Sequence, residues 1–112
     1  MSVRYVLAPE AQAQVDSIGA YIAEDSLDAA LKVYDALEEA FDLLAERPGI
    51  GHSRKDLTDR PVKFWSVYSY LVVYDPATRP TTIVAVLHGA QDIKGLLERK
   101  NVVSNSESHR VD

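Results

Sequence analysis

The order of apolar patterns along the chain predicts a two-layer α+β domain with the element order β-αα-βββ-α. Two observations carry this prediction. Two long stretches with apolar residues at helical spacing are separated only by residues 24–26, so they must pack as an antiparallel helical hairpin. Three β-rich runs then follow one another after residue 60 and predict an antiparallel meander. The hairpin is expected to cover one face of a small mixed, mostly antiparallel sheet, which a first short strand joins after the helical crossover.

The first strand and the first helix are predicted from residues 3–22. Residues 3–7 alternate in character, as a half-buried strand does. Pro9 followed by Glu10 marks a helix start, because proline suits the first helical position and an acid suits the positive end of the helix dipole. The apolar stripe of this helix is Ala11, Val15, Ile18 and Ile22.

The second helix is predicted to begin after Asp25 or Ser26, either of which can cap it. Arg47 lies near its C-terminus, where a cation suits the dipole, and Pro48-Gly49 ends it. Gly49 and Gly51 are interpreted as a helix cap and a turn. The apolar face of this helix is Ala30, Val33, Tyr34, Leu37, Phe41 and Leu44.

The second half of the chain predicts a polar loop, three strands and a short helix. The connection at residues 75–80 is rich in turn formers, and Pro61 stands at the start of a strand, where a missing donor is tolerated. In chain order these elements are a loop at 50–60, strands at 61–65, 68–74 and 81–88, and a helix at 91–99.

A single domain is expected over residues 1–100, with a polar, disordered tail at 101–112 that lacks any periodicity. The core is expected to combine the helical stripes with alternate residues of two strands. The side chains predicted to be largely buried are Val15, Ile18, Ile22, Val33, Leu37, Phe41, Leu44, Leu71, Val73, Val84 and Val86.

Composition narrows the possible classes of protein. The chain has 112 residues, 46% hydrophobic and 26% charged, as expected for one soluble domain. It has no cysteine, which excludes disulfides, thiolate metal sites and cysteine nucleophiles. Neither a signal-peptide core nor a membrane-length apolar run is present, so a cytoplasmic protein is the expectation.

The net charge of −5 is unevenly distributed. Residues 1–50 carry three Lys/Arg against ten Asp/Glu, whereas residues 51–100 carry eight against five. This split predicts two surfaces with different partners. The acidic balance makes direct nucleic-acid binding unexpected, because phosphate affinity comes mainly from Lys and Arg.

No catalytic, cofactor or metal site is predicted. His52, His88 and His109 lack metal-ligand spacing. The carboxylates of the two helices fit a solvated face, because nothing in the sequence places one in a cleft. His88 is the most interesting histidine, since Gly89 follows it at a strand-to-helix turn, and we interpret it as a possible functional turn that fixes the chain by hydrogen bonding.

A basic and aromatic group of residues is the main candidate for a binding site. Its members stand in the loop and the strand after it: Arg54, Lys55, Arg60, Lys63 and Trp65, followed by Tyr68 and Tyr70. Cations beside aromatics at strand spacing could bind RNA through stacking and charge. They could equally form a protein-binding face, or Trp65 and some tyrosines could be core residues.

Five blocks in this order resemble the RelE/ParE superfamily, and more narrowly the ParE toxins of bacterial type II toxin-antitoxin systems. The resemblance runs from about Val3 to Leu97. The blocks are Leu7-Ala8-Pro9-Glu10-Ala11, Ile18-Gly19-Ala20-Tyr21-Ile22, Pro48-Gly49-Ile50-Gly51-His52, Tyr70-Leu71-Val72-Val73-Tyr74 and Val86-Leu87-His88-Gly89-Ala90-Gln91-Asp92. The last block is the most specific.

The resemblance implies a toxin that inhibits DNA gyrase by binding, without chemistry or a cofactor of its own. It also implies a ParD-like antitoxin whose acidic, partly disordered segment neutralises the toxin. We expect this segment to contact Arg54, Lys55, Arg60 and Lys63, with Trp65 as an aromatic anchor.

Two alternatives stay open. The RelE-like branch consists of ribosome-dependent mRNA endonucleases, and this function would need Arg60, Lys63 and His88 to converge on one face. Ala85 and Gln91 stand where many relatives place arginines, and preorganised cations are what phosphate cleavage requires. The second alternative is a degenerate member that binds its antitoxin without toxicity.

Overall fold

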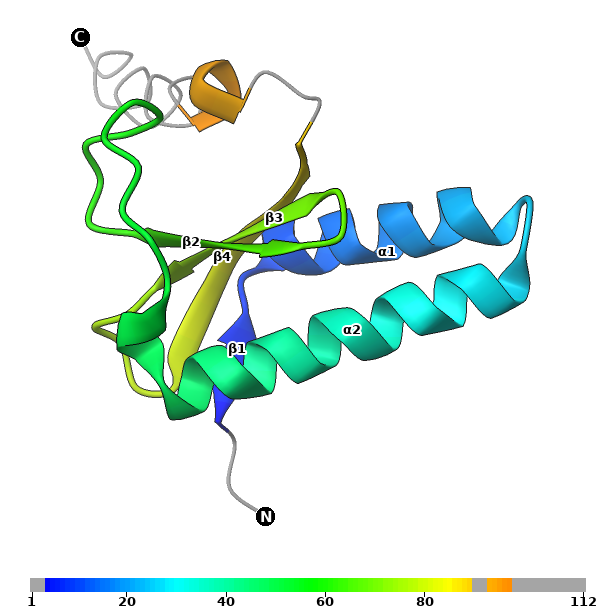
Figure 1. Ribbon diagram of the computed structural model, residues 1–112, viewed down its shortest axis with the longest axis horizontal. Helices are drawn as coiled ribbons and strands as arrows, with labels where there is room; N and C mark the ends of the chain where they lie inside the picture. Colours follow the sequence, from blue (N-terminus) through cyan, green and yellow to red (C-terminus); the bar gives the residue numbers. More distant parts are fainter. Residues whose placement is uncertain (1–3, 90–92, 98–112) are drawn as a thin grey trace, which may run out of the picture.

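The computed structural model describes residues 4–89 and 93–97, and its element order confirms the predicted α+β fold (Figure 1). Residues 93–97 are helical, and the ends of the helix predicted at 91–99, like the tail at 101–112, lie outside the described residues. The other elements are β1 (Tyr5–Leu7), α1 (Pro9–Ala23), α2 (Leu27–Glu46), the 3-10 turn η1 (Pro48–Ile50), β2 (Lys63–Val67), β3 (Tyr70–Asp75) and β4 (Thr81–His88).

The four strands form one mixed sheet in the order β1-β4-β3-β2. β1 pairs with β4 in parallel, while β2–β3 and β3–β4 are antiparallel. The bounds of β4 agree with the prediction. β2 lies two residues later than predicted, and β3 begins at Tyr70, because Tyr68 and Ser69 form the turn between these strands.

The helical hairpin begins and turns where local signals predict. Pro9 stands in the first turn of α1. Of the two candidate caps for α2, Ser26 is the cap, and its Oγ accepts a hydrogen bond of 3.1 Å from the amide of Ala29. Gly19 lets the hairpin close, because a Cβ at this position would collide with the hydroxyl and ring of Tyr34 on α2.

The predicted glycine cap of α2 is wrong. Arg47 is the C-cap, η1 follows directly, and no glycine among the described residues has a positive φ. Instead the fully buried Tyr74 secures this corner. Its hydroxyl donates to the Pro48 carbonyl at 2.7 Å and accepts from the Gly51 amide at 2.9 Å. Gly51 is needed because a Cβ there would meet the Tyr74 phenol.

The sheet has a core on each face. The first core lies between the hairpin and the sheet and contains Ala11, Val15, Leu37, Phe41, Leu44, Val72, Tyr74, Ile83 and Val86. The second lies on the opposite face, beside the helical residues 93–97, and contains Val62, Phe64, Val73, Ala85, Leu87, Ile93 and Leu97. The expected two layers are therefore supplemented by a small third one.

Five residues predicted to be largely buried are half-buried: Ile18, Ile22, Val33, Leu71 and Val84. The hairpin projects past the edge of the sheet, so side chains toward its joint are covered mainly by the other helix (Figure 1). Val84 differs for another reason. The β3–β4 register shifts between Val73 and Tyr74, so Val84 is the extra residue of a β-bulge and does not share the face of Val86.

Candidate functional site

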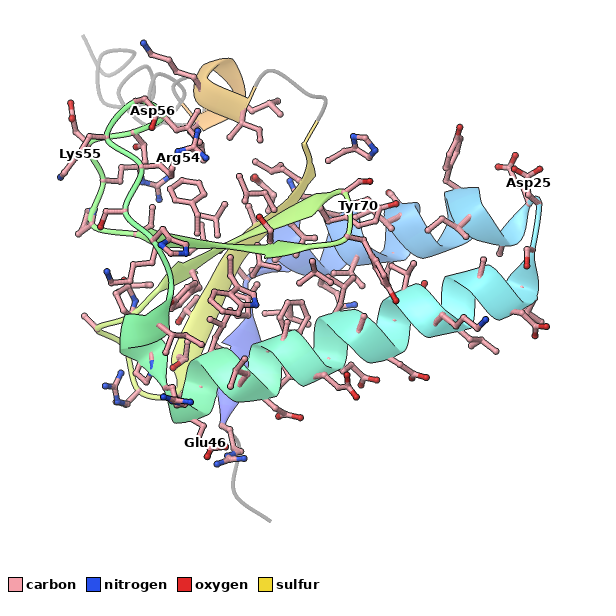
Figure 2. All side chains as sticks on the ribbon, in the orientation of Figure 1. Asp25, Glu46, Arg54, Lys55, Asp56 and Tyr70 are labelled. Carbon is pink, nitrogen blue, oxygen red and sulfur yellow. The ribbon has the colours of Figure 1, made fainter. Side chains whose placement is uncertain are left out.

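The predicted binding residues on β2 and in the preceding loop are divided between the two faces of the sheet. Trp65 packs against the first core, and Lys63 shares its face because alternate strand residues point the same way. Arg54 lies on the opposite side, in the loop beside the helical residues 93–97, with Lys55 exposed next to it (Figure 2). The basic group is therefore two small patches that are separated by the edge strand β2.

Arg54 is held by a neighbouring carboxylate. Its Nε donates to Oδ1 of Asp56 at 2.9 Å and its Nη2 donates to Oδ2 at 2.8 Å. The hydrogen bond from Arg54 lowers the pKa of Asp56, and the charge of Lys94 acts in the same direction. The same hydrogen bond raises the pKa of Arg54. The guanidinium thus presents both donors in the fork geometry that binds one carboxylate.

A concavity of about 630 Å³ opens beside this pair. Its charged lining residues are Arg54 and Lys94, and its aromatic ones are Tyr68 and Tyr70. Tyr68 and Tyr70 belong to the predicted basic and aromatic group, whereas Lys94 was not among the predicted site residues. Lys94 precedes the apolar pair Leu96-Leu97 on a short helix, and only the packing of that helix against the second core brings it to Arg54.

Trp65 and Arg60 are both half-buried, so part of each side chain packs against the protein itself. The indole of Trp65 stacks on the imidazole of His52, with ring centroids 6.3 Å apart and planes inclined by 10°. His52 is itself fixed by two backbone hydrogen bonds to Phe64. Arg60 is half-buried, and its Nη1 is buried without a hydrogen-bond partner within the described part of the chain.

His88 ends β4 on the side of α1. It is exposed and pairs across the sheet with Tyr70, whose ring meets the imidazole edge-on at a centroid distance of 5.4 Å. Both residues line a second concavity of about 420 Å³ together with Tyr21 of α1. The turn that follows His88 is anchored by the Gly89 amide, which donates to the Ser69 carbonyl at 2.7 Å.

Lys63 and His88 do not lie close together, as the nuclease alternative would require. Lys63 pairs with Tyr74 and His88 with Tyr70, so the two lie at opposite ends of β3. At about 3.3 Å per residue they are roughly 13 Å apart along the sheet alone. Ala85 is 2% exposed within the second core, so its place on β4 lies inside the protein and not on a surface.

The acidic residues of the hairpin form a solvated face, as predicted. The following eight carboxylates of the helical hairpin are exposed: Asp16, Glu24, Asp28, Asp35, Glu38, Glu39, Asp42 and Glu46. Among residues 4–89 and 93–97 there is no group of three or more His, Asp or Glu side chains that could hold a metal ion. The same part of the chain contains no helix long and apolar enough to cross a membrane.

The candidate site thus consists of cationic and aromatic side chains on the surface of a small α+β core. Side chains of these types are the ones that protein-binding faces favour. The sequence model of the family described as "ParE toxin of type II toxin-antitoxin system, parDE" matches residues 5–93. The chain therefore belongs to the ParE toxin family, and it is the toxin component of a type II toxin-antitoxin system. No curated protein sequence matches the chain.

Proposed function

We propose that this toxin acts in the bacterial cytoplasm by binding and inhibiting DNA gyrase, and that a ParD-like antitoxin neutralises it. The observation that carries the binding mode is the lack of cations on β4. Its central residues Ala85, Val86 and Leu87 are buried in the two cores, so this strand offers no charged surface for phosphate chemistry. The toxin needs no cofactor in this proposal.

The antitoxin contact is proposed at the basic residues around β2. Arg54 and Lys55 lie on one side of this strand, and Lys63 and Trp65 lie on the other. β2 is an edge strand, so a single extended segment can reach both patches only by crossing that edge. Arg60 is half-buried in the loop before β2, and its charge adds to the positive potential of this surface.

The test of the target combines two assays on the purified protein. We expect inhibition of supercoiling by purified gyrase and no cleavage of ribosome-bound mRNA. Ribosome-dependent cleavage without an effect on gyrase would instead establish the endonuclease. A protein that binds antitoxin yet is inactive in both assays would be a degenerate toxin, and the gyrase proposal would be rejected.

The test of the antitoxin surface reverses charge at Arg60 and Lys63 together. The Arg60→Glu/Lys63→Glu variant should associate more slowly with antitoxin and show a weaker salt dependence, because surface charges mainly govern the association rate. A pair on the acidic hairpin, Glu38→Gln/Glu39→Gln, is the matched control and should leave the rate within about twofold of wild type, since it lies away from the basic patches. Unchanged association of the reversed variant at low ionic strength would exclude this surface.

A further inference from the structure

The turn between β2 and β3 contains a residue that is unfavourable for its backbone. Val67 pairs with Tyr70, so Tyr68 and Ser69 form a two-residue hairpin connection. Tyr68 has φ 53°, and among the described residues it is the one non-glycine residue with positive φ. Glycine, asparagine or aspartate are preferred at this position, because a bulky side chain is strained there.

Contacts of the Tyr68 side chain with the described residues offset little of this strain. It is 71% exposed, so little of its ring is buried against the protein. It stands on the lining of the 630 Å³ concavity, beside Arg54 and Lys94. A large aromatic ring kept at a strained, exposed position next to two cations is suited to bury itself against a partner.

One lining residue of the concavity, Arg54, already binds a carboxylate. Arg54 holds the carboxylate of Asp56 through two parallel hydrogen bonds of 2.9 and 2.8 Å. Asp56 is exposed and two residues away in a loop, and Lys94 is near enough to influence its ionisation. Asp56 therefore occupies a place that a carboxylate from another chain could take, and the second cation favours a further acidic group.

We propose that this concavity docks an extended acidic peptide segment, with Tyr68 as its aromatic anchor and Asp56 as an internal competitor for Arg54. This proposal rests on the proposed function, in which a segment of the antitoxin contacts the basic residues, and it adds where an acidic segment would bind. The charge of the lining supports this occupant, since its described residues include two cations, Arg54 and Lys94, and no carboxylate.

The probe is a short fluorescein-labelled peptide of alternating aspartate and valine, titrated at low and at physiological ionic strength against the full chain. A peptide of alternating lysine and valine is its control. We expect the acidic peptide to bind, its affinity to fall with salt, and the basic peptide not to bind. Failure of the acidic peptide to bind at low ionic strength would overturn the proposal.

Two variants separate an effect on peptide binding from a general loss of folding. A substitution that merely damaged the fold would lower both stability and peptide affinity, whereas each of these variants is expected to raise one of the two. Tyr68→Gly should raise the melting temperature by roughly 2–5 °C, since glycine accepts this φ, yet weaken peptide binding by at least about tenfold. Asp56→Asn should strengthen binding by roughly two- to fivefold, because it releases Arg54 from an exposed ion pair.

The matched control is Tyr21→Ala. Tyr21 is similarly exposed, at 74%, but it lies on α1 and lines the other concavity. This variant should leave binding of the acidic peptide unchanged. Equal losses for Tyr21→Ala and Tyr68→Gly, or weaker binding by Asp56→Asn, would refute the assigned site. Gyrase inhibition is measured separately, so its absence would reject the proposed target without affecting this result.

Discussion

Replacing Tyr74 with phenylalanine should destabilise the protein because it removes one hydroxyl that serves two backbone groups. The side chain is fully buried, and its hydroxyl bonds both the Pro48 carbonyl and the Gly51 amide. A typical hydrogen bond contributes about 0.5–1.5 kcal/mol, so losing both costs about 2 kcal/mol. In a domain of this size that loss lowers the melting temperature by roughly 8–10 °C.

The assay is urea denaturation followed by circular dichroism, with a thermal melt on the same samples. Tyr21→Phe is the control, because the phenol of Tyr21 is on an exposed side chain and its loss should change stability by less than about 0.5 kcal/mol. If Tyr74→Phe loses no more than this control, the Tyr74 hydroxyl does not secure the corner after α2.

The same residue predicts a dependence of stability on alkaline pH. Burial raises the pKa of Tyr74 above its ordinary value of 10.0, although the bond from Gly51 opposes this. The pKa of Tyr74 is therefore higher in the folded protein than in the unfolded chain. The stabilisation that this difference contributes is complete below pH 10 and is lost as the pH rises through the folded pKa. Tyr74→Phe should show a smaller loss of stability above pH 10 than wild type. The pKa of Tyr5 is also raised by burial, so some loss should persist.

Three further substitutions test other contacts. Gln14→Ala should cost about 1–3 kcal/mol in urea denaturation, because its Oε1 accepts the Val86 amide at 2.7 Å and would leave that donor unsatisfied; a loss below about 0.5 kcal/mol would contradict this role. Ser26→Ala should cost about 1 kcal/mol, whereas Ser26→Asp should retain the cap of α2; equal losses would argue against capping. His88→Ala should keep growth inhibition largely intact, whereas loss of a catalytic base would cost about 10²–10⁴-fold in rate. A stably folded but non-toxic His88→Ala protein, combined with mRNA cleavage by wild type, would favour the nuclease.

Local signals account for the elements that were predicted well. The two helices follow from apolar spacing, and their starts follow from Pro9 and Ser26, which act on neighbouring backbone groups. The apolar run of β4 is long enough for its bounds to be predicted from residues 81–88 alone. These signals depend on the order of residues in the chain and need no knowledge of the partner elements.

The assignment of strand residues to faces could not be predicted in the same way. Simple alternation placed Val84 with Val86, but the bulge opposite Val73 and Tyr74 turns Val84 to the other face. A shift of one residue moves a strand's side chains to the opposite face. Such a shift is decided by the pairing of β3 with β4, which no local pattern of β4 contains.

The sequence by itself determined the family, the element order, the solvated acidic hairpin and the separation of acidic from basic halves. These follow from composition, from periodicity and from motifs that are contiguous in the chain. Only the tertiary structure decided that Lys63 and Trp65 lie apart from Arg54, and that Arg54 joins Lys94 and Tyr68 around one concavity. The physical reason is that these neighbours come from different elements, so their distances depend on strand register, a strained turn and the packing of the last helix.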